Sequence, residues 1–161
     1  MSLWVLHFFR WLGHTPLSIA LRHSTWGFAV IETIHLLSLA LFGGAILLVD
    51  LRLLGVGLRR QPASRVAREV SPVLLISLLV MLVSGVLLVV TGPLKYYHSP
   101  WFRTKMAFLS AAIVFYFTFH RVVTKSDFEG RPPLRSKLAA LLSLALWFGV
   151  GLAGRAIGFL G

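Results

Sequence analysis

The sequence predicts an all-α fold, an integral membrane four-helix bundle that forms a single domain, and three observations support this prediction. The mean hydropathy of +0.84 is far above that of an ordinary soluble domain. Four apolar runs are each long enough to cross the ~30 Å hydrocarbon layer of a bilayer, which takes about 20 residues. Most Lys and Arg residues lie between these runs, as positive-inside retention requires.

The helices expected in chain order are a short interfacial helix at 2–13 and transmembrane helices at about 24–50, 71–91, 100–123 and 137–160. The first segment mixes Trp and Phe with one Arg and one His, a composition that favours the headgroup layer. Thr15-Pro16 and Ser99-Pro100 each read as a helix N-cap followed by proline at the first helical position. The breaker string Thr91-Gly92-Pro93 ends the second run.

The net charge of +11 lies mainly in the connections, where anionic headgroups account for it, so we expect a lipid bilayer and no nucleic acid as partner. Segments 51–69 and 121–137 carry five Lys or Arg residues each, against six in the rest of the chain. This bias predicts that both termini lie on the outer side. The chain has no cysteine, which excludes disulfides, iron–sulfur clusters, thiolate-bound metals and covalently attached c-type haem.

The informative residues are the ionisable ones inside the apolar runs, because such groups are costly in lipid and are usually turned inward and partnered. They are Glu32, His35, Asp50 and His120. Glu32 and His35 are three positions apart and share a helix face. Three interpretations stay open for this pair: a haem or metal ligand oriented by its neighbour, a proton relay, or a buried polar pair that pins helix packing.

His120 is the candidate for an opposing axial ligand, although snorkelling beside Arg121 at the end of its helix is the alternative. At 1.5 Å per residue, His35 lies ~15 Å and His120 ~30 Å from the outer ends of their helices, so their depths match poorly. His98 lies in an expected outer loop that can fold back over the bundle.

Several strings of the chain resemble an uncharacterised family of small bacterial four-helix inner-membrane proteins, over about Ser24 to the C-terminus. The strings are Glu32-Thr33-Ile34-His35-Leu36-Leu37, Asp50-Leu51-Arg52-Leu53-Leu54-Gly55, Lys95-Tyr96-Tyr97-His98-Ser99-Pro100, Phe119-His120 and Gly154-Arg155. That family is loosely similar to the copper-resistance D proteins and the four-helix b-type cytochromes. The resemblance implies a multi-pass protein of the bacterial inner membrane, with periplasmic termini, and favours haem or copper as ligand.

The function that we expect is therefore binding of haem b and electron transfer with a quinone or a periplasmic redox protein. His35 and His120 are the favoured axial ligands, and the resemblance implies a role in cofactor binding for His98 as well. Lys105 and Arg155 are cations that suit the propionates. The alternative is a copper or zinc site near the outer face, for which the candidate ligands are Glu32, His35, His98 and His120. The sequence leaves open whether the chain is a haem-dependent oxidoreductase, and it does not set an oligomeric state.

Overall fold

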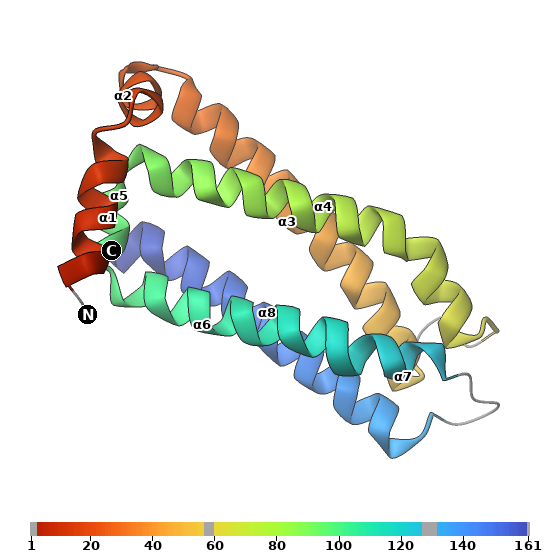
Figure 1. Cartoon of the computed structure of the whole chain (residues 1–161). Coiled ribbons are helices and arrows are strands. Elements are labelled where there is room, and N and C mark those ends of the chain that lie inside the picture. The colour runs from red at the N-terminus through yellow and green to blue at the C-terminus, as the bar shows by residue number, and fades with distance from the viewer. Residues whose placement is uncertain (1–2, 57–59, 127–131, 161) are drawn as a thin grey trace.

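The computed structural model describes residues 3–56, 60–126 and 132–160, which form an elongated helical bundle (Figure 1). In chain order the elements are α1 (Leu3–Gly13), α2 (Pro16–His23), α3 (Gly27–Leu54), α4 (Ala63–Thr91), α5 (Pro93–His98), α6 (Pro100–Phe115), η1 (Tyr116–His120), α7 (Arg121–Lys125) and α8 (Leu134–Leu160). α3, α4, the continuous run Pro100–Lys125 and α8 are each long and apolar enough to cross a membrane. The predicted fold class is confirmed.

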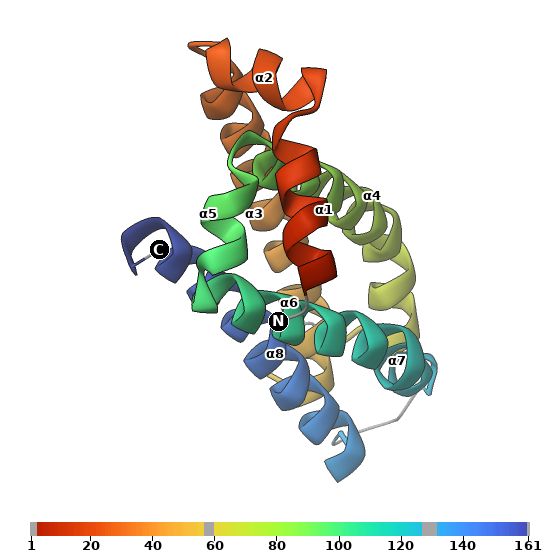
Figure 2. The same cartoon turned by 60° about the vertical axis from the view of Figure 1, so that its left-hand side comes forward.

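The four spans are arranged as two closely packed pairs. α3 lies against α4, α6 lies against α8, and α3 also contacts α8. α1, α2 and α5 cover one end of the bundle, which we call the terminal end, and the end of α3, the start of α4, α7 and the start of α8 lie at the other, which we call the basic end (Figures 1 and 2). α4 contacts the third span at α7, toward the basic end, rather than along α6.

The predicted helix caps are confirmed. Thr15 caps α2, where its side chain accepts a hydrogen bond from the backbone N–H of Ser18, and Ser99 caps α6 in the same way. The start of the second span was predicted too late, because α4 begins at Ala63 and runs through Pro72. The apolar run marks only the part of a helix in hydrocarbon, whereas the helix itself continues through polar surroundings.

Two further predicted boundaries differ from the structure. The expected outer loop before the third span contains the short helix α5, and α3 extends to Leu54. Gly55 ends α3 in the left-handed region at φ +77°, where its N–H bonds to the carbonyl of Arg52. A Cβ on Gly55 would lie 2.5 Å from Cγ of Pro132, so the turn requires glycine. Ser2, Arg59 and Arg131 of the predicted segments lie outside the described residues.

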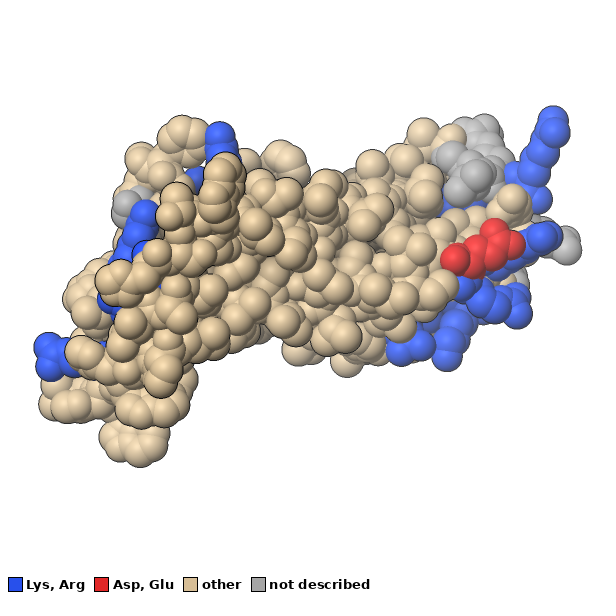
Figure 3. Space-filling model, turned by 90° about the horizontal axis from the view of Figure 1, so that it is seen from above, with Lys and Arg blue, Asp and Glu red and all other residues tan. Residues whose placement is uncertain are grey.

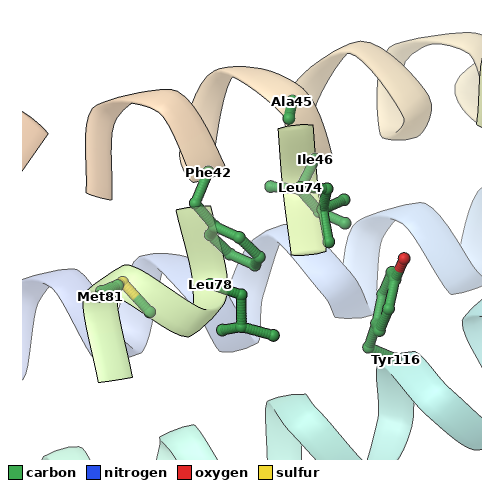
Figure 4. Close-up of a cluster of buried hydrophobic side chains, with 7 residues drawn as sticks. All are labelled: Phe42, Ala45, Ile46, Leu74, Leu78, Met81 and Tyr116. Carbon is green, nitrogen blue, oxygen red and sulfur yellow. The ribbon is translucent and has the colours of Figure 1, made fainter. Parts of the chain in front are cut away.

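Charge and packing divide the bundle along its length. Figure 3 shows a broad uncharged belt between two ends that carry Lys and Arg, with most of the basic side chains on this face at one end. Buried apolar side chains form two clusters: one in the middle of the bundle, around Phe42, Leu78 and Tyr116 (Figure 4), and one toward the basic end, around Leu53 and Val123. Among the described residues, no third cluster fills the terminal half.

Candidate functional site

His35 lies in the first half of α3, which is nearer the terminal end of the bundle, and its side chain contacts α4. Its Nδ1 is 3.0 Å from the hydroxyl oxygen of Ser84, which is also 2.6 Å from the carbonyl of Val80. A serine hydroxyl has one hydrogen, and the Val80 carbonyl accepts it, so Nδ1–H of His35 donates to Ser84. This tautomer places the lone pair of the ring on Nε2, and the backbone carbonyl of Met81 also lies beside the imidazole. The imidazole is half-buried.

Two glycines make room for the polar groups at this level. A Cβ on Gly85 would lie 3.3 Å from Cε1 of His35, so the imidazole rests against the backbone of α4. A Cβ on Gly154 would lie 3.4 Å from Nζ of Lys105, so the lysine lies across α8 in the same manner. Lys105 is near enough to act electrostatically on His35. Histidine, lysine and their glycine neighbours therefore define one region, which we call the terminal site.

The other predicted site residues near the terminal end lie around the terminal site and not in it. Glu32 is exposed and near Tyr96. Burial, together with the Glu32 carboxylate, raises the pKa of Tyr96 above its ordinary value, so its phenol stays protonated. His98 is exposed, and its Nδ1–H donates to the Leu94 carbonyl at 2.9 Å. Arg155 is exposed with its guanidinium 4.2 Å from the ring centroid of Phe159.

A second polar group lies deep in the bundle toward the basic end. Nε2 of His120 is 2.7 Å from Oδ1 of Asp50, and the two side chains are 1% and 0% exposed. His120 belongs to η1, a π-helical turn within the third span, and such turns are rare and frequent at functional sites. The ring of Tyr116 stacks on the imidazole with centroids 5.5 Å apart, and Ser143 of α8 lies beside the carboxylate. We call this group the inner pair.

The structure does not bring His35 and His120 together. His120 is hydrogen-bonded to Asp50, which lies fifteen positions after His35 on the same straight run of α3. At 1.5 Å per residue, the two histidines are therefore about 22 Å apart along the bundle. Two axial ligands must bind one iron atom from opposite sides, so this geometry corrects the predicted pairing of His35 with His120.

The candidate metal ligands are also dispersed. Over the described ranges, no three His, Asp or Glu side chains lie close enough together to form a metal-binding group. Glu32 is near Tyr96, His35 bonds to Ser84, and His98 bonds to its own helix. The predicted cluster of Glu32, His35 and His98 is thus not assembled in this arrangement.

Comparison with known proteins identifies the family of this chain. A family model described as a family of unknown function, DUF6644, matches residues 8–160. The chain belongs to the DUF6644 family. This agrees with the resemblance to an uncharacterised membrane family and extends it toward the N-terminus. No curated protein and no solved structure matches this DUF6644 chain.

Sequence reasoning missed the partners of both histidines. Ser84 and Gly85 interrupt a run of large apolar residues in α4, and that interruption was the available signal for the partner of His35. Asp50 lies four positions before the end of α3, and His120 five positions before the end of the third span. Their equal depth was the signal for the inner pair.

Proposed function

We propose that this protein binds one haem b in the terminal half of the bundle, with His35 as an axial ligand. The observation that carries the proposal is the state of His35. Its Nδ1–H donates to Ser84, which fixes the ring and the tautomer and places the lone pair on Nε2. A hydrogen bond on the second ring nitrogen is the usual companion of metal-bound histidine.

The packing of the bundle supports an apolar group at this level. Both buried apolar clusters lie in the middle and toward the basic end, and α4 does not pack along α6. A four-helix bundle requires a filled core, and cofactors in such bundles lie between facing helices. We place the porphyrin between the two helix pairs in the terminal half, where neither buried apolar cluster lies.

A single fixed histidine favours haem over a bare metal ion. A porphyrin contributes four nitrogens, so the protein has to add one or two axial ligands. Copper or zinc needs three or four protein ligands, and the described residues offer no such group. The copper or zinc alternative therefore requires Glu32 and His98 to move toward His35.

Lys105 suits the charged edge of the cofactor. The structure records no ion pair or hydrogen bond for its ammonium group among the described side chains, although the lysine is half-buried in a membrane span. Intramembrane charges are usually neutralised by a partner. A haem propionate provides that partner, and the protonated phenol of Tyr96 provides a hydrogen-bond donor at the rim.

Haem at this depth favours electron transfer at the terminal end. Ten of the sixteen Lys and Arg residues lie in segments 51–69 and 121–137. The described residues of these segments lie at the basic end, which the positive-inside rule assigns to the cytoplasm. The terminal site then faces the periplasm of a bacterial inner membrane, within reach of a quinone or a periplasmic redox protein. Oxidoreductase activity would follow from such a partner.

The test is an absorption spectrum of the purified protein, expressed with a haem precursor supplied and measured oxidised and reduced. We expect a Soret band, a shift on reduction, and about one haem per chain by pyridine haemochrome assay. His35→Ala should remove the band, whereas the matched variant His23→Ala should keep it because His23 is exposed at the end of α2. A colourless wild-type protein, or His35→Ala that keeps its haem, would overturn the proposal.

A further inference from the structure

The inner pair has a pattern of satisfied and unsatisfied atoms that a packing role does not require. Oδ1 of Asp50 and Nε2 of His120 bond to each other at 2.7 Å. The second carboxylate oxygen, Oδ2, and the second ring nitrogen, Nδ1, are both buried without a hydrogen-bond partner. Buried polar atoms are nearly always satisfied, so each such atom indicates a missing water or a functional role.

The net charge of the pair restricts what it can do. The pair is neutral when Nδ1 carries its proton and one further proton is shared between Oδ1 of Asp50 and Nε2 of His120. A second further proton, or the loss of the shared one, would leave a net charge in a low-dielectric site. Loading or unloading a single proton is therefore costly. A concerted exchange, in which one proton enters as another leaves, keeps the pair neutral.

We assign the proton exchange to Asp50 and His120 alone, on the basis of the described side chains around them. The Ser143 hydroxyl of α8 interacts with the Asp50 carboxylate without a hydrogen bond of normal geometry, so Oδ2 stays without a hydrogen-bond partner, and Tyr116 of η1 stacks on the imidazole. Several charged groups near this end have other partners or surroundings, and Arg60, Arg68 and Lys125 are exposed. Arg52 of α3 donates to the Gln61 carbonyl, Arg65 and Glu69 of α4 pair with each other, Arg121 of α7 lies over Phe117, and Arg135 and Lys137 of α8 are exposed.

The geometry points to a proton relay formed by Asp50 and His120, a role separate from the proposed haem. A hydronium ion gives a proton to Oδ2, the proton on Oδ1 moves to Nε2, and the proton on Nδ1 leaves to a second water molecule. One proton enters, one leaves, and no net charge accumulates. The two unpartnered atoms are the entrance and the exit of this path, and passage in the opposite direction restores the starting state.

The basic end is the nearer source of water for the relay. Asp50 lies four residues from the end of α3 at Leu54, which is about 6 Å, but about 35 Å from its start at Gly27. The π-helical turn at Tyr116–His120 lies beside it and bonds the N–H of Arg121 to the carbonyl of Tyr116, an i→i+5 pattern that frees neighbouring backbone groups to hold water.

Hydrogen exchange on the His120 ring separates a relay from a sealed structural pair. We would label histidine with ¹⁵N, assign His120 by the signal that His120→Asn lacks, and transfer the wild-type protein to D₂O in micelles. A relay gives the His120 ring protons a protection factor at least tenfold lower than that of the buried amides of α3. A structural pair exchanges only when the protein unfolds, with the same protection factor as those amides, and that result would overturn the proposal.

Asp50→Asn is the matched variant, because the amide keeps a hydrogen-bond acceptor but cannot pass a proton. We expect exchange on His120 to slow at least tenfold in this variant, and exchange as fast as in wild type would exclude Asp50 from the path. If Asp50→Asn does not fold, the wild-type comparison alone decides. His35→Ala should exchange normally at His120, so failure of the haem proposal and failure of the relay are distinguishable.

Discussion

Asp50→Ala tests how strongly the inner pair holds the bundle together. In the structure the Nε2 of His120 bonds to Oδ1 of Asp50, and Nδ1 has no partner. The substitution leaves a 1% exposed imidazole with both ring nitrogens unsatisfied. Removing one member of a buried hydrogen-bonded pair destabilises a protein by about 1–3 kcal/mol, because the remaining member keeps its desolvation penalty. We expect a loss of that size.

The assay is reversible unfolding in mixed detergent micelles, followed by far-ultraviolet circular dichroism. Glu69→Ala is the matched control, because it breaks the Arg65–Glu69 pair, an i,i+4 pair whose side chains are 62% and 55% exposed. Such exposed pairs contribute about 0.3–0.5 kcal/mol. The double variant Asp50→Ala/His120→Ala should lose less than the sum of the single losses. An Asp50→Ala loss no larger than that of Glu69→Ala would refute the reasoning.

Three further substitutions follow from the contacts described above. Ser84→Ala frees the His35 ring, so haem affinity should fall about 10–100-fold in a haem titration, and unchanged affinity would remove Ser84 from the site. Gly85→Ala places a methyl group 3.3 Å from Cε1 of His35, so haem occupancy should fall. This fall is expected even though alanine favours the helix over glycine by about 0.5–1 kcal/mol. Haem occupancy equal to that of the wild type would show that the His35 ring is not confined. Gly55→Ala meets Pro132 at 2.5 Å with φ +77°, so thermal unfolding should show a loss of at least about 1 kcal/mol, and wild-type stability would contradict this cap.

The fold was largely predictable because hydrocarbon thickness and capping chemistry act locally. Four apolar runs identified the four spans, and Thr15 and Ser99 marked two helix starts. The start of α4 was missed because its first turns are polar and Pro72 lies inside the helix. Helical structure at the membrane surface is set by caps and packing, neither of which hydropathy measures.

The sequence identified residues of the candidate sites, but it did not identify the side chains that they contact. His35 and Asp50 were singled out because ionisable groups are costly in lipid, and both have polar partners in the structure. Their partners depend on how the helices face one another, which the sequence of one helix does not specify. Depth along each helix carried part of the answer, since it disfavoured His35 with His120 before the structure separated them.

The terminal site and the inner pair are independent polar sites of the bundle, and the haem content of two glutamine variants distinguishes two sites from one. His35→Gln and His120→Gln are expressed in parallel with haem precursor, and haem per folded chain is measured for each. We expect His35→Gln to be colourless and His120→Gln to retain about one haem per chain. Loss of haem from folded His120→Gln would contradict this independence, because the two histidines would then serve one site.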